Sequence, residues 1–244
     1  MKKLFWMVVF LAAVECTFAQ AGLPKISIGV GEAKSQGDVS TSLQIMALLT
    51  VLSLAPALMI LTTAFTRIVI IMSFVRTALG TQSIPPNQVM VGLSMFLTFF
   101  VMGPTWQKVN VNAVQPYFEK KISQQQAIDR ATIPVRDFML KNTYEKDLKM
   151  FLDIRKEKPK TKADVSVTAL IPAFVISELK TAFIVGFYIF IPFLIIDLVV
   201  ASGLMSMGMM MLPPSIVSLP AKLLVFVLAD GWSTLVTAIL SGYR

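Results

Sequence analysis

Residues Asp197 to Pro214 read D-L-V-V-A-S-G-L-M-S-M-G-M-M-M-L-P-P and lie between two long apolar segments. A stretch with glycine that ends in Pro-Pro predicts a break between helices, so we expect the turn of a helical hairpin at residues 201–214. This methionine turn holds five of the chain's 15 methionines: Met205, Met207, Met209, Met210 and Met211. Methionine is unbranched and polarisable. The cluster either fills a core or faces lipid, or it lines a surface that closes and then gives way. A break that stays apolar favours the second interpretation.

The composition is typical of a membrane protein. Of the 244 residues, 55% are hydrophobic and the mean hydropathy is +0.72, which is too apolar for a soluble globular domain. The excess of 22 Lys and Arg over 14 Asp and Glu reflects anionic lipid and topology more than nucleic acid on so apolar a chain. Histidine is absent and there is one cysteine. The commonest general base is therefore missing, and we expect no catalytic residue, metal site or cofactor.

Residues 1–19 have the pattern of a cleaved secretory signal peptide. Two lysines precede an apolar stretch, Leu4 to Val14, and a small-x-small cleavage site ends at Ala19. An uncleaved membrane helix is the alternative, but this stretch is well short of the ~20 residues that a span needs. A lipoprotein would use Cys16 as lipid acceptor, and the glutamate before it fits that poorly. We expect residues 20–42, which are polar, to form a flexible periplasmic lead-in.

Four apolar segments follow that are long enough to span a bilayer. They are Leu43 to Phe65, Asn87 to Gly103, Val165 to Val200 and Ile216 to Leu240. Prolines inside three of them predict kinks. We therefore expect an all-α membrane protein. Two long helical hairpins with kinked helices, residues 43–104 and 165–244, would flank a polar helical insert at residues 105–164.

The insert is rich in lysine and arginine, interleaved with acidic residues. Tyr117 to Asp129 and Pro134 to Asp153 show helical patterning. In the second segment an apolar face is formed by Phe138, Leu140, Tyr144, Leu148, Phe151 and Leu152. We interpret the insert as solvated, because nucleic-acid binding would favour an aromatic stacking platform that is missing here. A cleaved signal peptide predicts that the insert is periplasmic. The positive-inside rule would place so basic a segment in the cytoplasm, but this rule weakens for long loops. The basic linker Arg155 to Lys162 is a candidate contact for lipid head groups.

Seven charges lie within or beside the apolar segments: Arg67, Arg76, Glu178, Lys180, Asp197, Lys222 and Asp230. Such charges are costly in lipid and usually face protein or a water-filled path. Glu178 and Lys180 are two residues apart, so on a helix they cannot pair well with each other. Asp197 and Lys222 flank the methionine turn, and either the hairpin brings them together or each pairs with the next subunit. We expect an obligate assembly that buries these groups.

Long stretches of the chain resemble the FliP family. The segment F-T-R-I-V-I-I-M-S-F-V-R-T-A-L-G-T-Q-S-I-P-P-N-Q (Phe65 to Gln88) resembles its first signature, as does L-T-F-F-V-M-G-P (Leu97 to Pro104). The segment S-E-L-K-T-A-F (Ser177 to Phe183) and the run from Phe187 to Pro214 resemble the second, which continues as S-L-P-A-K-L-L-V-F-V-L-A-D-G-W (Ser218 to Trp232). The resemblance covers essentially all of the apolar chain.

This resemblance implies a protein of the flagellar type III secretion export gate, in the bacterial inner membrane and flagellar basal body. The family assembles as a helical or ring-like oligomer, and the resemblance suggests a pentamer. Its partners are FliQ-type and FliR-type gate subunits and FlhB-type and FlhA-type export proteins. The family's helices are largely lifted out of the bilayer plane in the assembled gate. Its methionine turn closes the channel as a gasket, a role that the resemblance carries to Met209, Met210 and Met211, with Met205 and Met207 in support.

The leading functional hypothesis is thus a non-enzymatic pore subunit that passes unfolded flagellar proteins across the inner membrane. The sequence has no G-x-x-x-x-G-K-[ST] phosphate loop, so energy would come through partners. A secondary transporter or proton channel is the alternative, because Glu178, Lys180, Asp197 and Asp230 can form a relay. An intramembrane enzyme is a remote third hypothesis, since no paired-carboxylate motif is present.

Overall fold

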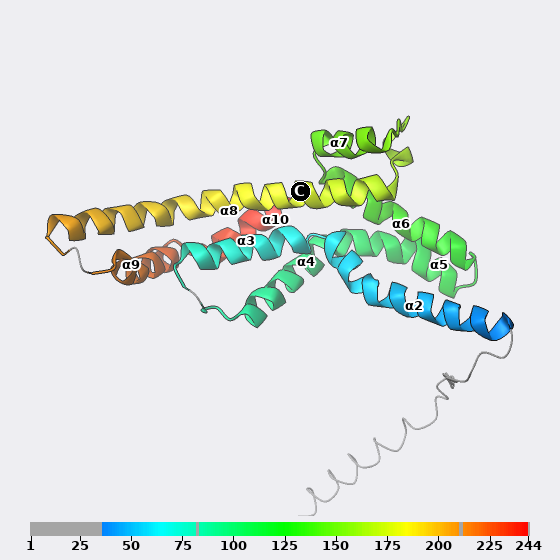
Figure 1. Ribbon diagram of the computed structural model, residues 1–244, viewed down its shortest axis with the longest axis horizontal. Coiled ribbons are helices and arrows are strands. Elements are labelled where there is room, and N and C mark those ends of the chain that lie inside the picture. The colour runs from blue at the N-terminus through cyan, green and yellow to red at the C-terminus, as the bar shows by residue number, and fades with distance from the viewer. Residues whose placement is uncertain (1–35, 82, 210–211, 244) are drawn as a thin grey trace, which may run out of the picture. The chain divides into compact units, whose positions relative to one another are not determined.

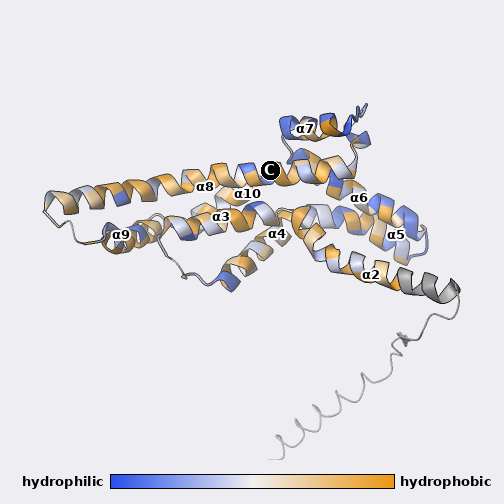
Figure 2. Ribbon diagram, viewed as in Figure 1, coloured by the Kyte–Doolittle hydropathy of each residue, from blue (hydrophilic) through white to orange (hydrophobic). Residues whose placement is uncertain are grey.

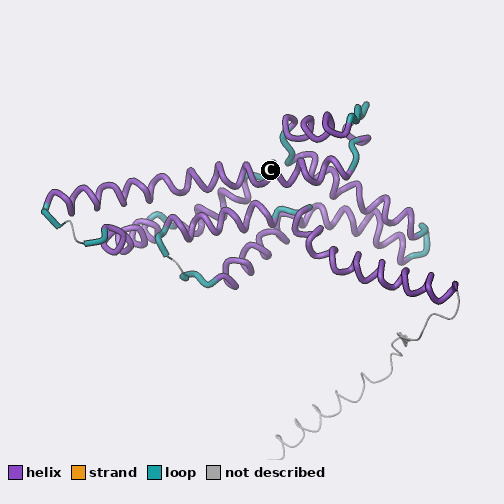
Figure 3. The backbone as a smooth tube through the Cα atoms, viewed as in Figure 1, coloured by secondary structure: helices purple, strands orange, loops and turns teal. Residues whose placement is uncertain are grey.

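The computed structural model describes residues 36–81, 83–209 and 212–243, and the regular structure in these ranges is entirely helical (Figure 3). The predicted all-α class is therefore confirmed. The predicted signal peptide with its cleavage site at Ala19, most of the lead-in, Met210 and Met211 lie outside the described residues. The chain divides into two units between Thr50 and Val51, and the description below concerns the second unit unless α2 is named.

Helix α2 (Gln36–Leu61) crosses the division between the units and contains Pro56. It begins before Leu43, so the end of the predicted lead-in is helical. The polarity of these residues excludes them from lipid but does not exclude them from a helix. In the described part of α2 most of the leucines are exposed, among them Leu52 and Leu58.

The second unit continues with a series of helices of very different length (Figure 1). They are α3 (Phe65–Ala78), α4 (Asn87–Val109), the π-helical turn η1 (Asn110–Val114), α5 (Gln115–Phe118), α6 (Gln124–Lys141), α7 (Glu145–Arg155), the 3-10 turn η2 (Lys162–Asp164), α8 (Val167–Ser206), α9 (Pro214–Leu228) and α10 (Gly231–Ser241).

The main core is built around α3, which lies alongside α8 (Figure 1). Apolar side chains from α4, α8, α9 and α10 pack against a fully buried stripe on α3. This stripe consists of Ile68, Ile71, Met72, Val75 and Ala78. The two helices approach closely at Gly186, where a Cβ atom would stand 2.4 Å from Cδ2 of Phe74. Only glycine leaves room for the Phe74 ring at this crossing.

A second, smaller core joins the insert to the first turns of α8. Its fully buried side chains are Met139, Val165, Leu170 and Phe174. Four residues of the predicted apolar face pack there, namely Phe138, Leu140, Leu148 and Leu152. The insert is therefore a packed part of the fold, and Figure 2 shows hydrophilic and hydrophobic residues alternating along α6 and α7.

The helix boundaries within the insert differ from the predicted ones. The segment Tyr117 to Asp129 is interrupted after α5, because Lys120 takes a left-handed φ of 58° and Ser123 starts α6 with a capping box to Gln126. The segment Pro134 to Asp153 is also two helices, with Pro134 inside α6 and a break between α6 and α7. At that break the Asn142 side-chain amide donates to the carbonyl of Phe138, 2.9 Å away, and ends α6.

Two helical stretches are long and apolar enough to cross a membrane, judged by length and composition in the described residues: Asn87–Phe118 and Val167–Ser206. The number rises to four if two bent pairs each count as one span. These are Ile45–Leu61 with Phe65–Ala78, bent by 63°, and Pro214–Leu228 with Gly231–Ser241, bent by 66°. The second bend falls at Asp230, whose φ is 47°, and not at Pro220, which lies inside α9.

Helix α8 is continuous over 40 residues and includes both Pro172 and Pro192. At 1.5 Å per residue it is ~60 Å long, twice the ~30 Å of a bilayer's hydrocarbon core. Its first turns are covered by α6 and α7. Toward its C-terminal end it exposes large apolar side chains such as Phe187, Leu198 and Val199. A single helix thus connects the insert to the methionine turn.

Candidate functional site

The methionine turn is set by the way in which α8 ends. Gly208 adopts a φ of 74°, a left-handed conformation that glycine takes without steric cost. Its N–H donates to the carbonyl of Met205 at 3.1 Å, and the N–H of Met209 donates to that of Leu204 at 3.0 Å. These two bonds form a Schellman motif, which satisfies carbonyls at the end of the helix. Pro214 then occupies the first turn of α9, where a missing N–H costs nothing.

The described methionines of the turn point away from the core. The exposed fractions are 60% for Met205, 74% for Met207 and 41% for Met209. Residues 201–206, predicted to lie in the turn, belong instead to α8, so Met205 lies in the last turn of that helix. The chain therefore presents largely exposed thioether side chains at the end of a long helix.

Asp197 and Lys222 meet across the turn. Lys222 Nζ on α9 donates to Asp197 Oδ2 on α8 at 2.6 Å, and Lys222 is buried while Asp197 is half-buried. Of the two arrangements that the sequence left open, the structure has the one within a single chain. A Cβ atom on Gly80 would lie 3.7 Å from Lys222 Nζ, so this ion pair also abuts the loop between α3 and α4.

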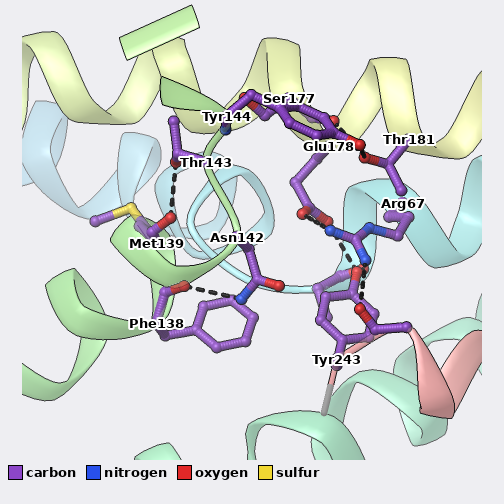
Figure 4. Close-up of polar contacts among 12 residues, drawn as sticks. Arg67, Phe138, Met139, Asn142, Thr143, Tyr144, Ser177, Glu178, Thr181 and Tyr243 are labelled. Carbon is purple, nitrogen blue, oxygen red and sulfur yellow. Dashed lines mark hydrogen bonds and ion pairs between the residues drawn. The ribbon is translucent and has the colours of Figure 1, made fainter. Parts of the chain in front are cut away.

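Arg67 and Glu178 form a second, fully internal pair between α3 and α8 (Figure 4). Arg67 Nη2 pairs with Glu178 Oε1, and its Nη1 donates to the carbonyl of Gly242 at 3.2 Å. The Tyr243 hydroxyl donates to Glu178 Oε2 at 2.8 Å, and the Tyr243 ring lies 4.0 Å from the guanidinium carbon. Glu178 is completely inaccessible to solvent. Three distant segments are therefore joined at one buried charge pair.

Lys180 faces the insert. Its Nζ lies 4.0 Å from Asp147 Oδ1 and 5.0 Å from the centre of the Tyr144 ring. The Ser177 hydroxyl donates to Asp147 Oδ2 at 2.9 Å and accepts from the backbone N–H of Tyr144 at 3.0 Å. Glu178 and Lys180 thus have different partners, as their spacing predicted, and together they connect α8 to both α3 and the insert.

Two of the seven charges have no opposite charge nearby. Arg76 Nη1 donates to the side-chain oxygen of Asn87, but no carboxylate of the described residues lies within 4.0 Å of it. The Asp230 side chain is exposed and has no hydrogen bond or ion pair in the same part of the chain. Sequence reasoning missed two partners of the paired charges, Asp147 and Tyr243, because both lie outside the apolar segments. Within the described residues no group of three or more His, Cys, Asp and Glu side chains is placed to hold a metal ion.

Residues 48–239 match the model of the FliP family. The chain is 53% identical over 217 residues to the flagellar biosynthetic protein FliP of Bacillus subtilis, which covers 88% of this chain and 98% of that protein. The protein of the same name from Aquifex aeolicus is 45% identical over 230 residues, 93% of this chain and 95% of that one.

The chain belongs to the FliP family.

A further relative with that name, from Agrobacterium fabrum, is 41% identical over 245 residues, 98% of this chain and 100% of its own. The residues that match the FliP family model include the methionine turn and all three ion pairs of the apolar helices. Tyr243, which completes the Arg67–Glu178 cluster, lies beyond that match. The site described above therefore falls almost entirely within the part of the chain that defines the family.

Proposed function

We propose that this FliP-family chain is a pore-forming core subunit of the flagellar type III export gate, which passes unfolded flagellar proteins across the bacterial inner membrane. The observation that carries the proposal is the position of the methionine turn. Met205, Met207 and Met209 are exposed at the end of a helix that is long enough to cross a bilayer. Several copies that place this turn around one axis form an apolar constriction.

Such a constriction suits the proposed substrates. Thioether side chains exclude water and ions when packed together, and they contact many sequences by dispersion without specific hydrogen bonds. Self-association, FliQ-type and FliR-type subunits, and FlhB-type and FlhA-type export proteins are the partners that family membership supports. The insert lies on the periplasmic side of the gate, within the basal body. The chain works without a catalytic step of its own, and partners supply the energy.

A secondary transporter or proton channel is the second candidate function. The contacts of the charged residues in the apolar helices allow it to be compared with the first. A relay needs titratable groups along a water-filled path. Glu178, Lys180 and Asp197 instead each contact an oppositely charged side chain of the same chain. This arrangement favours a structural role. The size of the detergent-solubilised complex separates the two candidates, since a gate subunit runs as a large hetero-oligomer and a transporter as a monomer or dimer.

The test of the pore changes Met205, Met207 and Met209 together to alanine in motile cells. We expect the complex to assemble, as judged by native gel, and the cells to leak ions, because alanine leaves the constriction too wide to exclude water. Changing the same residues to leucine should preserve the seal, since leucine keeps the apolar volume. Ion leakage and export of filament protein are the two measurements.

The matched control is Met150→Ala, because Met150 is exposed to 43%, like Met209 at 41%, but lies on α7 in the insert. It should neither leak nor lose export. If the triple alanine variant assembles, stays ion-tight and exports filament protein normally, the methionine turn does not seal a channel and the proposal is wrong.

A further inference from the structure

Lys180 stands at one end of an apolar stripe on α8. Ile184, Phe187, Leu194 and Leu198 follow it at helical spacing, so the five side chains share one face of the helix. The four apolar side chains are exposed to between 44% and 63%. From Ile184 to its last residue α8 is ~35 Å long, which is close to the ~30 Å of a hydrocarbon core. The stripe therefore has the length and character of a lipid-facing surface, with a cation at the end nearest the insert.

Trp106 marks a similar level on α4. It lines a pocket together with Phe65, the first residue of α3, which closely precedes Arg67. Arg67 pairs with Glu178 of α8, and Glu178 closely precedes Lys180. The part of α4 from its first residue to Trp106 is ~30 Å long, again the thickness of a hydrocarbon core. Tryptophan is enriched where a membrane meets water. Two helices thus place a bilayer boundary at the same level of the fold.

The ammonium group of Lys180 is only partly satisfied within the chain. Its side chain is exposed to 48%, and the one carboxylate of the described residues within reach, Asp147, has its Oδ1 atom 4.0 Å from Nζ. The other oxygen of Asp147 accepts a hydrogen bond from Ser177 at 2.9 Å. The Tyr144 ring, whose residue is exposed to 44%, lies 5.0 Å from Nζ. An ammonium group has three donors, so Lys180 has donors left for an anion outside the chain.

We propose that Lys180, beside the Tyr144 ring, binds the phosphate of an anionic phospholipid at the bilayer surface on the side of the insert. Lysine at the end of an apolar stripe extends its ammonium group to the head groups while its stem stays in apolar surroundings. Tyrosine is enriched at the same level of a membrane, and anionic lipid attracts basic side chains. The contact fixes the depth of α8 in the bilayer, and it does not rest on the proposed pore.

The alternative is that Lys180 serves only as the partner of Asp147. On that view its removal weakens the packing of the insert on α8 by the same amount in every lipid, whereas a phosphate contact depends on the charge of the lipid. An assembled gate whose helices are lifted out of the bilayer, as the family resemblance implies, breaks such a contact. The test therefore uses the full chain alone, reconstituted in nanodiscs of phosphatidylglycerol, which is anionic, or of phosphatidylcholine, which has no net charge.

The first measurement is the Tm of each protein in the two lipids. A lipid that binds only the folded state raises the Tm, and one lysine contact corresponds to ~2–4 °C at this chain length. We expect the wild type and Lys180→Arg to have a Tm higher by this amount in phosphatidylglycerol. Lys180→Gln should lose that difference. The matched control is Lys160→Gln, an exposed lysine of the basic linker, which should keep the full difference.

Three outcomes of this measurement overturn the inference. In the first, Lys180→Gln lowers the Tm equally in both lipids and keeps the wild-type difference, so that Lys180 is a structural residue only. In the second, the wild type has the same Tm in both lipids. In the third, inorganic phosphate added to phosphatidylcholine nanodiscs reproduces the shift, which would mean that the site binds a free anion and not a lipid.

Trp106 provides an independent measurement of depth. In a chain with Trp6→Phe and Trp232→Phe it is the only tryptophan, because the sequence has three. We expect its fluorescence to be quenched more by a nitroxide attached near the lipid head group than by one attached near the middle of the acyl chain. Stronger quenching by the deeper label would place Trp106 inside the hydrocarbon core and overturn the common boundary. Neither failure touches the pore proposal, which is tested at the methionine turn.

Discussion

The Tyr243 hydroxyl donates a hydrogen bond to the buried carboxylate of Glu178 at 2.8 Å, across 65 positions of sequence. The same ring lies over Arg67 and stacks against Phe138 of α6 at a centroid distance of 6.1 Å. A segment after α10 thereby closes the contact between α3, α6 and α8. Buried carboxylates are destabilising unless they are paired and hydrogen-bonded, so we expect the stability of the fold to depend on this one hydroxyl.

The change Tyr243→Phe tests that dependence. It keeps the ring over Arg67 and removes only the donor, so the free energy of unfolding should fall by ~1–3 kcal/mol. At this chain length ~1 kcal/mol corresponds to a Tm shift of ~2–4 °C. The measurement is thermal unfolding in detergent. Tyr117→Phe is the control, because Tyr117 is exposed and its hydroxyl has no partner among the described residues; equal Tm values for the two variants would contradict the expectation.

The Asp197–Lys222 pair predicts a measurable coupling. In a double-mutant cycle of Asp197→Ala, Lys222→Ala and both together, the two changes should be non-additive by ~0.5–3 kcal/mol, because the side chains are in direct contact. Lys222→Ala should cause the smaller loss of stability, because water can reach the half-buried Asp197 that remains. Asp197→Ala should cause the larger loss, because it leaves a buried ammonium without a partner. Strictly additive losses of Tm would mean that the two residues do not interact.

A third prediction concerns the crossing of α3 and α8. Gly186→Ala places a methyl group 2.4 Å from Cδ2 of Phe74, and such overpacking typically costs ~1–3 kcal/mol. Gly92→Ala is the comparison, because no heavy atom lies within 4 Å of a Cβ there and the residue is inside α4. That change should be neutral or stabilising by up to ~1 kcal/mol. A Gly186 variant as stable as the Gly92 variant would show that the Phe74 ring moves aside at little cost.

The start of α8 offers a pH-dependent test. The Ser166 hydroxyl donates to Glu157 Oε2 at 2.6 Å and accepts from the N–H of Ala169 at 3.3 Å. The bond from Ser166, and then that from Arg155, hold the pKa of Glu157 below its ordinary value of 4.5. A pKa that is lowered in the folded state stabilises the protein at pH values above the ordinary pKa of the group. This stabilisation disappears as the pH falls through the folded-state pKa.

Ser166→Ala should therefore lower the free energy of unfolding at neutral pH by ~1 kcal/mol, mostly through the lost helix cap. The difference in free energy of unfolding between the variant and the wild type should become smaller below pH 4.5, because the Ser166 hydroxyl no longer stabilises a charged Glu157 carboxylate there. The measurement is the unfolding midpoint of each protein at neutral pH and at a pH below 4.5. Thr132→Ala is the control, since Thr132 is exposed and its hydroxyl donates to the Ile128 carbonyl of its own helix, away from Ser166 and Glu157. A difference that widens in acid would contradict the assigned role of Glu157.

Apolar patterning predicted the helical class, the two hairpins and the insert, because hydrophobic length and helix breaks are local properties of the sequence. The Asp197–Lys222 contact was one of two arrangements that followed from the position of the turn between the two residues. The partner of Glu178 could not be predicted in this way, since Arg67 lies 111 positions earlier and no periodicity links the two. The bend at Asp230 depends on Gly231, which packs directly against the Phe226 ring. From the sequence, the proline inside this segment, Pro220, was the residue expected to produce a kink.

Helix α8 has a mechanical consequence. Its 40 residues form one rod, which packs against α6 and α7 near its first turn, against α3 farther along and against α9 toward its end. The rod carries Met205 in its last turn. Over a length of ~60 Å, a tilt of ~5° at its first turn displaces the far end by ~5 Å, about the rise of one helical turn. A small tilt of α8 that carries the packed α3 and α9 with it would therefore be amplified at the methionines. The distance between insert and turn makes α8 a lever.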